Sequence, residues 1–322
     1  MQRKDEQSCD KFCSADTNPE LHLIIFTKVP VLGCTKRRLG AQIGTELATQ
    51  ISAVLIEHTL AIANEWLQRL EANSTPVSVH LYYSPIGSES ERAADADSWL
   101  DTNVRKRYPA FRVVPQSQAK RAEQDEDRRD PLGVRLIQAF REVTSSLGPQ
   151  RSALVMVIGS DCPLLDANRL ERAFALLKAG HQAVIGPAAD GGYYLLGLQF
   201  KRSDRCDWMR MIQAAFGPHL VFSQGNVCQR TLDALQAAGV MTVRLSETLW
   251  DIDTAEDLTH LPASLRPAGC PLPCSAEKMV SGQNSRDIHP ETSSSEFRNG
   301  SGTCEHGQTA GVRGDSSDAA SR

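Results

Sequence analysis

The chain has 322 residues, of which 41% are hydrophobic and 23% are charged, and its formal net charge is −4. This composition suits a soluble globular protein and excludes a wholly disordered one, and the negative charge argues against nucleic-acid binding. No apolar run approaches the roughly 20 residues that span a bilayer, and the polar first 20 residues lack the apolar stretch of a signal peptide. We therefore expect a cytoplasmic protein with no membrane partner.

Hydrophobic periodicity predicts alternating strands and helices between residues 21 and 261. In chain order we expect a strand at 21–27, a helix at 44–70, a strand at 77–83, a helix at 89–107, a strand at 111–115, a helix at 132–147, a strand at 153–158, a helix at 166–179, strands at 183–186 and 193–198, helices at 207–215 and 226–238, a strand at 240–245 and a short helix at 254–261. Long helices between strands imply crossover connections and a mostly parallel sheet covered on both faces. The expected fold is a single Rossmann-type three-layer α/β/α domain.

The two ends of the chain differ from this region in composition. Residues 263–322 are rich in Ser, Gly and scattered charge and hold seven large apolar side chains. Burying those side chains would stabilise by roughly 10–20 kcal/mol, whereas ordering the backbone would cost roughly 60–120 kcal/mol. We expect a disordered tail at 263–322, a flexible extension at 1–20 and a folded domain at 21–262. The charge-dense run at 120–130 is predicted to be a mobile loop or a solvated connection.

A basic loop follows the first predicted strand and carries Lys28, Gly33, Lys36, Arg37 and Arg38. Ligands of open α/β sheets bind beyond the carboxyl ends of the strands, so this loop could surround a polyphosphate. Main-chain N–H groups and arginine forks would supply hydrogen bonds, and Lys36 a point charge. The spacing is not that of a Walker A loop. A solvated basic patch is the alternative.

Ser160 and Asp161 directly follow the most apolar predicted strand. A carboxylate at the end of a buried strand needs a partner, and Mg²⁺ or Mn²⁺ is suitable because hard cations prefer oxygen ligands. The alternative is that one of the two residues caps the turn that follows.

Asp251 and Asp253 precede the last predicted helix. Thr254 and Asp257 have the spacing of a capping box, with Asp in place of Glu. That role leaves Asp251 and Asp253 unexplained. Two carboxylates at alternate positions of an extended segment point the same way and repel each other unless a cation intervenes. We therefore count both among the candidate metal ligands.

Asp190, Gly191 and Gly192 stand between two predicted strands. Paired glycines allow the backbone to approach a ligand closely, and Asp190 lies at the mouth of the turn. A plain tight turn is the alternative.

Four motifs occur in order along the chain: Lys-x-Pro-x-x-Gly-x-x-Lys-x-Arg-Leu from Lys28, Gly-Ser-Asp-x-Pro-Leu from Gly159, Asp-Gly-Gly-Tyr-Tyr-Leu-Leu-Gly from Asp190 and Trp-Asp-x-Asp-Thr-x-Glu-Asp-Leu from Trp250. Together they resemble the radical-SAM/selenodomain-associated transferases, often labelled arsenosugar-biosynthesis glycosyltransferases. That family belongs to the GT-A-like nucleotide-diphospho-sugar transferase superfamily, which also includes nucleotidyltransferases such as phospholactate guanylyltransferase. The resemblance spans about residues 21–261 and implies a GT-A-like sheet that binds a nucleotide donor.

The resemblance also implies roles for individual residues. Lys36 and Arg38 would contact the donor phosphates, Gly33 would shape their loop, and Asp161 and Asp253 would hold Mg²⁺ or Mn²⁺. The remaining implied positions are on the substrate side: Lys28, Ser160, Asp190, Gly191, Gly192 and Gly133, the last in a segment at 130–136 that is similar to the family's Asp-Leu-Gly-Glu-Arg-Met element. Three residues depart from the family pattern, because Arg37, Val134 and Phe222 stand where Thr, Glu and Trp are usual.

We therefore predict a metal-dependent glycosyltransferase that takes a nucleotide-sugar donor and a small-molecule acceptor. Positive charge from the metal, Lys36 and Arg38 would stabilise the leaving diphosphate, and Asp190 would act as general base. The same residues could serve nucleotidyl transfer from an NTP, and a non-catalytic nucleotide-binding protein is a third reading. The transferase chemistry requires that Asp161 and Asp253 meet around one cation beside the basic loop.

Overall fold

The computed structural model describes residues 19–84, 90–116, 131–147, 151–222 and 224–271. The predicted loop at 120–130, the first 18 residues and the chain beyond residue 271 lie outside this described part. None of the helices in the described part is long and apolar enough to cross a membrane.

A seven-stranded sheet forms the centre of the structure, in the order β3-β2-β1-β4-β6-β5-β7. The strands are β1 (Glu20–Lys28), β2 (Val77–Ser84), β3 (Phe111–Pro115), β4 (Ala153–Gly159), β5 (Ala183–Pro187), β6 (Tyr193–Phe200) and β7 (Thr242–Arg244). Only β6 runs antiparallel to its neighbours; the other described pairs are parallel. The prediction of a mostly parallel sheet is therefore confirmed.

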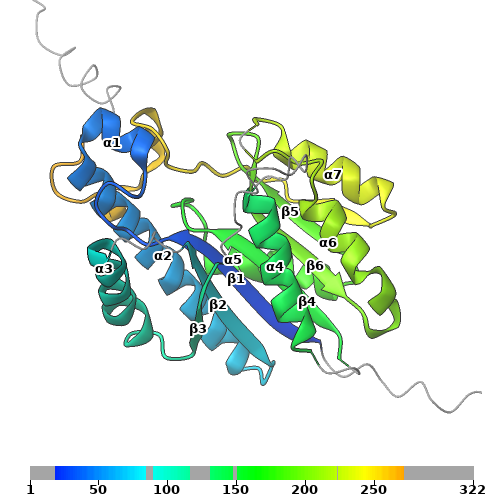
Figure 1. Ribbon diagram of the computed structural model, residues 1–322. Helices are drawn as coiled ribbons and strands as arrows, with labels where there is room; N and C mark the ends of the chain where they lie inside the picture. Colours follow the sequence, from blue (N-terminus) through cyan, green and yellow to red (C-terminus); the bar gives the residue numbers. More distant parts are fainter. Residues whose placement is uncertain (1–18, 85–89, 117–130, 148–150, 223, 272–322) are drawn as a thin grey trace, which may run out of the picture. The chain divides into compact units, whose positions relative to one another are not determined.

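Helices cover both faces of the sheet (Figure 1). They are α2 (Thr45–Glu71), α3 (Ser90–Leu100), α4 (Pro131–Ser145), α5 (Ala167–Lys178), α6 (Trp208–Phe216) and α7 (Val227–Ala237). In β1, Leu23 and Ile25 pack into the apolar cluster that contains α2 and α5, whereas Ile24 packs into the cluster that contains α4 and α6. Successive strand residues point to opposite faces, so a continuous apolar strand is the pattern that both layers require.

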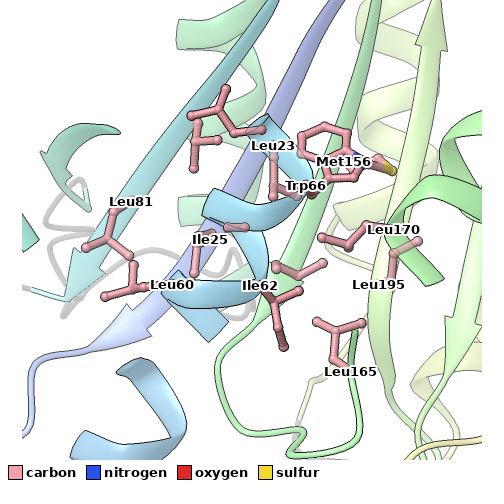
Figure 2. Close-up of a cluster of buried hydrophobic side chains, with 14 of the residues drawn as sticks. Leu23, Ile25, Leu60, Ile62, Trp66, Leu81, Met156, Leu165, Leu170 and Leu195 are labelled. Carbon is pink, nitrogen blue, oxygen red and sulfur yellow. The ribbon is translucent and has the colours of Figure 1, made fainter. Parts of the chain in front are cut away.

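Helix α2 illustrates how the sequence specifies an element. Its residues Ile51, Leu55 and Ile62 recur at spacings close to the helical repeat and are buried. Figure 2 shows Leu60, Ile62 and Trp66 of this helix packed against Leu23 and Ile25 of β1. Fully burying a large apolar side chain stabilises by about 1.5–3 kcal/mol, so this face fixes the helix on the sheet.

A third, smaller apolar cluster forms a corner beside the sheet. It joins α1 (Arg37–Ile43), the first turns of α2 and the segment around the 3₁₀ helix η3 (Glu256–His260). Leu39 and Ile252 are both fully buried there. The backbone N–H of Ala255 also donates to Oε1 of Gln42 at 2.7 Å. The corner thereby holds the segment around residues 252–255 against α1.

The structure differs from the expected elements in a few places. Helix α1 was not predicted, and the expected helix at 89–107 ends in a short π-helical turn, η1 (Asp101–Arg105). Two short 3₁₀ elements complete the described elements: η2 (Arg202–Asp207) and η4 (Ala263–Leu265). Leu265 and Cys270 pack against the corner cluster, so the described chain continues beyond the predicted domain boundary at residue 262.

Candidate active site

The basic loop leads from the carboxyl end of β1 into α1. Val29 and Val31 are buried and anchor the loop, and Gly33 has a φ of 75°. Lys36, which immediately precedes α1, has left-handed backbone angles of φ 44° and ψ 45°. Such angles are uncommon for a residue other than glycine. Lys28 and Arg38 are exposed, whereas the side chain of Lys36 is only 5% exposed.

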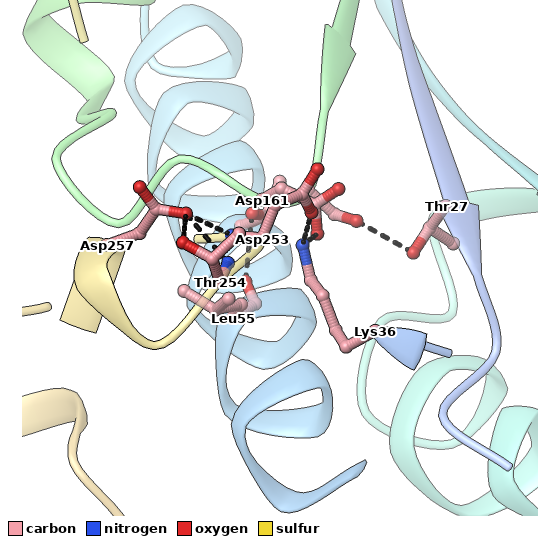
Figure 3. A network of polar contacts seen from close by, with 9 residues as sticks. Thr27, Lys36, Leu55, Asp161, Asp253, Thr254 and Asp257 are labelled. Atoms are coloured by element: carbon pink, nitrogen blue, oxygen red, sulfur yellow. Dashed lines mark hydrogen bonds and ion pairs between the residues drawn. The ribbon is translucent and has the colours of Figure 1, made fainter. Parts of the chain in front are cut away.

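The ammonium of Lys36 lies between two carboxylates (Figure 3). Its Nζ is 2.6 Å from Oδ1 of Asp161 and 3.0 Å from Oδ1 of Asp253. The structure thus brings these two aspartates together on one cation, which is the side chain of Lys36 itself. Burial works against the charged lysine, but the two carboxylates outweigh it and raise its pKa.

The charge of Asp253 is stabilised in turn by the basic residues around it. Burial would raise the pKa of its carboxyl group, but Lys36, and then Arg38 and Lys28, lower it. The carboxylate is therefore charged in the neutral pH range. Arg38 and Lys28 influence it through their charges, as expected of basic residues beside the site.

Local hydrogen bonds fix the segment that carries Asp253. The backbone N–H of Ile252 donates to the carbonyl oxygen of Asp161 at 3.1 Å. Oδ2 of Asp257 accepts from the backbone N–H of Thr254 at 2.7 Å and from its hydroxyl at 2.9 Å, and also from the N–H of Asp253 (Figure 3). Asp257 therefore reaches back to Thr254 as the capping spacing predicts, but it belongs to the short 3₁₀ helix η3 and not to the expected helix at 254–261.

Asp251 and Asp190 add negative charge to this neighbourhood. Burial raises the pKa of Asp251 to about 6, and the charges of Asp190, Asp253 and Asp161 contribute to the shift. Asp190 is exposed, and its Oδ1 accepts a 2.7 Å hydrogen bond from the N–H of Gly192.

The Gly191–Gly192 turn packs against the loop that precedes α7. Gly191 has a φ of 87°, and a Cβ at this position would overlap the carbonyl of Gly225. The carbonyl of Gly191 also accepts from the N–H of Cys228 at 2.8 Å. A tight turn alone does not explain Gly191, because the close approach of a second backbone segment also requires glycine.

Ser160 joins two strand ends rather than the charged cluster. Its hydroxyl is 2.8 Å from that of Thr27 at the end of β1, and both side chains are buried. The buried amide of Gln116 donates to the carbonyls of Thr27 and Tyr82. Sequence reasoning missed Thr27 and Gln116, although both are polar residues at strand ends.

Gly133 lies buried in α4, where a Cβ would come within 2.7 Å of the carbonyl oxygen of Phe216 and 3.2 Å of the ring of Phe222. This close helix contact accounts for a glycine here. Phe222 also packs edge-on against Tyr193. The structure thus places Gly133 in helix packing, and its predicted contact with substrate stays a prediction.

The side chains of the site can be compared with the ligands that the implied metal ion would need. Within the described residues, no three Asp, Glu, His or Cys side chains are grouped closely enough to hold a metal ion. Two carboxylates, Asp161 and Asp253, do share one cation position. Mg²⁺ typically uses only one or two protein carboxylates and completes its shell with water and substrate phosphates. The pair therefore fits Mg²⁺ or Mn²⁺ bound together with a phosphate ligand, and does not fit an all-protein cage.

Comparisons with known proteins bear on the fold. A family model described as "Uncharacterized protein conserved in bacteria (DUF2064)" matches residues 72–213, from the end of α2 into α6. No protein of curated function matches the chain.

Solved structures that are similar to this one include the following three. A protein from Desulfovibrio desulfuricans G20, described as a "putative nucleotide-diphospho-sugar transferase", is 22% identical, with a TM-score of 0.54 over 82% of this chain and 95% of that chain. A 4-diphosphocytidyl-2C-methyl-D-erythritol synthase is 14% identical, with a TM-score of 0.38 over 71% and 89%. A CMP:2-keto-3-deoxy-manno-octonic acid synthetase complexed with CTP is 10% identical, with a TM-score of 0.37 over 73% and 93%. The first of these similarities shows that the chain has a nucleotide-diphospho-sugar transferase-like fold.

Proposed function

We propose that the chain is a metal-dependent glycosyltransferase that uses a nucleotide-sugar donor and a small-molecule acceptor. The observation that supports this most directly is the meeting of Asp161 and Asp253 on one cation position beside a basic loop. The two aspartates come from segments about ninety residues apart, and a site for a cation and a diphosphate needs both signs of charge at one place. The nucleotide-diphospho-sugar transferase-like fold agrees with this function.

The roles follow from the chemistry of each residue. Asp161 and Asp253 would hold Mg²⁺ or Mn²⁺ together with the donor's diphosphate, and the bound metal would supply positive charge to the leaving group. Lys36 and Arg38 would add positive charge where the diphosphate becomes more negative as the sugar leaves. Asp190, whose Oδ1 is oriented by the N–H of Gly192, would take the proton of the acceptor hydroxyl at Oδ2.

The metal ligands can be tested by Asp161→Asn and Asp253→Asn. A unit charge pair 4 Å apart contributes about 4 kcal/mol at an effective dielectric of 20, so each change is expected to reduce turnover by several hundred-fold or more. The measurement is Mn²⁺-dependent release of nucleoside diphosphate from a panel of nucleotide sugars with mixed hydroxyl acceptors. The matched control is Asp97→Asn, because Asp97 is an exposed aspartate paired only with Arg105 among the described contacts. It should retain full activity.

Several outcomes would contradict the proposal. Near-wild-type turnover in both variants would remove the metal assignment. Pyrophosphate release from an NTP, without any nucleoside diphosphate from nucleotide sugars, would replace glycosyl transfer by nucleotidyl transfer. Tight nucleotide binding without turnover across all acceptors would indicate a binding protein.

A further inference from the structure

The cation position shared by Asp161 and Asp253 is filled by the chain's own Lys36 ammonium. We propose that Lys36 is an internal cation that a divalent metal must displace, so that metal and donor diphosphate bind together while metal alone binds poorly. This rests on the function proposed above and adds to it an interdependence between the two ligands.

Lys36 is held firmly at this position. Its side chain is 5% exposed, although lysine side chains ordinarily keep their ammonium in water. Its backbone adopts left-handed angles that cost a non-glycine residue free energy and persist only where the surroundings impose them. Leu39, three residues further on, is buried in the corner cluster and fixes the start of α1. The neighbouring Arg38 is exposed and makes no described ion pair with either aspartate.

Displacing the ammonium by a metal ion alone is unfavourable. The metal would take both carboxylates and leave a buried, positively charged lysine beside it without a counter-charge, which is costly. A diphosphate changes this balance because its anionic oxygens offer the ammonium new partners. The flexible four-carbon stem of lysine allows the ammonium to turn from one set of oxygens to another.

The proposal can be tested on the full chain with Mn²⁺ and inorganic pyrophosphate as probes. Water-proton relaxation reports Mn²⁺ bound to the protein, alone or with pyrophosphate. The wild type is compared with Lys36→Met, which removes the ammonium and keeps the stem, and with Lys36→Arg, which keeps the charge. We expect K36M to bind Mn²⁺ alone about tenfold tighter or more, and K36R to bind it as weakly as the wild type. The factor by which pyrophosphate improves Mn²⁺ binding should fall in K36M.

Removing any nearby positive charge also strengthens the binding of a cation, so Arg38→Met serves as the control. Because Arg38 acts on Asp253 only at a distance, R38M should strengthen Mn²⁺ binding less than about threefold. Melting temperatures confirm that each variant is folded, and Lys36→Gln replaces K36M if the methionine variant is not.

Three results would overturn the proposal. Equal Mn²⁺ affinity in the wild type and K36M, or an equal gain in R38M and K36M, would show that Lys36 does not compete with the metal, and the metal site would still stand. Absence of Mn²⁺ binding in every variant, with pyrophosphate present, would overturn the metal site and with it the function proposed above.

Discussion

Lys36 and Gly191 both adopt positive φ at the edge of the candidate site, for different reasons. At Lys36 the left-handed backbone directs a charged side chain inward to Asp161 and Asp253. At Gly191 the same region of φ allows a turn to lie directly against the backbone of Gly225. Backbone strain concentrated near functional groups is a common property of binding sites, since only a well-packed surrounding structure maintains it.

Because the backbone of Gly225 lies so close to Gly191, adding one methyl group at Gly191 should strongly lower the stability of the fold. Gly191→Ala should lower the free energy of unfolding by about 2–4 kcal/mol, because positive φ and backbone overlap both act against alanine. Gly239→Ala is the matched control: Gly239 has a φ of 76°, but a Cβ there would meet no atom within 4 Å. It should cost about 1 kcal/mol. Urea denaturation measures both, and equal losses would contradict the packing argument.

Strands β1 and β2 carry a buried pair of histidines. Nδ1 of His22 lies 3.2 Å from Nε2 of His80, and each residue is 5% exposed. Burial, followed by the charges of His22 and Arg112, lowers the pKa of His80 to about 4. Burial also lowers the pKa of His22, although Glu20 opposes this. The folded sheet therefore favours the neutral form of both rings.

This pair predicts acid sensitivity with a defined window. In the unfolded chain His80 takes up a proton near pH 6.5, whereas in the folded chain it does so only near pH 4. The contribution of neutral His80 to the free energy of unfolding is therefore complete above pH 6.5. It is lost as the pH falls to 4, which lowers the free energy of unfolding by about 3 kcal/mol. His80→Gln keeps a polar side chain that does not titrate, so its stability should fall less over this range. Denaturation curves between pH 4 and 7.5 measure the difference, and parallel losses in both proteins would refute the assignment.

At the scale of the whole molecule, the candidate site lies where the sheet meets the corner cluster. Asp161 extends from β4, whose residues pack in the two main clusters, while Asp253 adjoins Ile252 of the corner cluster. Relative placement of the two aspartates therefore depends on a small group of apolar side chains. We therefore expect a loss of packing at Ile252 to weaken cation binding at the site as well as the stability of the fold.

Ile252→Ala tests this dependence. Removing a fully buried isoleucine side chain should lower the free energy of unfolding by about 2–4 kcal/mol. Ile212→Ala in α6, which is equally buried but belongs to another cluster, should destabilise similarly. Only I252A should also weaken binding of Mn²⁺ with pyrophosphate, measured by water-proton relaxation below the melting temperature. Equal binding in both variants would show that the corner does not position Asp253.

Most helices and strands could be predicted because the spacing of their apolar residues is a local property of the sequence. The apolar spacing of α2 predicted 44–70, and the helix spans Thr45–Glu71. Helix α1 has only seven residues and begins with two arginines, which resemble a solvated loop. The antiparallel direction of β6 could have been inferred, because five residues between β5 and β6 are too few for a crossover.

The candidate site was only partly accessible to sequence reasoning. Polar residues after strands indicated Asp161 and Asp253, since the carboxyl ends of parallel strands meet at one edge. The position of the Lys36 ammonium between them depends on the left-handed backbone and on the corner cluster, neither of which has a local signal. Thr27 and Ser160 are 133 residues apart in the chain, and they meet only because β1 and β4 are neighbours in the sheet.

The reversed direction of β6 has a consequence for how this scaffold can diversify. Because β6 runs opposite to β4 and β5, its first residues emerge at the edge where those strands end. The turn at 188–192, which joins the end of β5 to the start of β6, therefore lies at that edge, as do the segments after β1 and β4. Changes in these segments leave the register of the sheet intact, since loops tolerate changes that strands do not, but Gly191 is fixed by its contact with Gly225. The loops at this edge can accordingly acquire new side chains, while the strand that positions Asp161 stays unchanged.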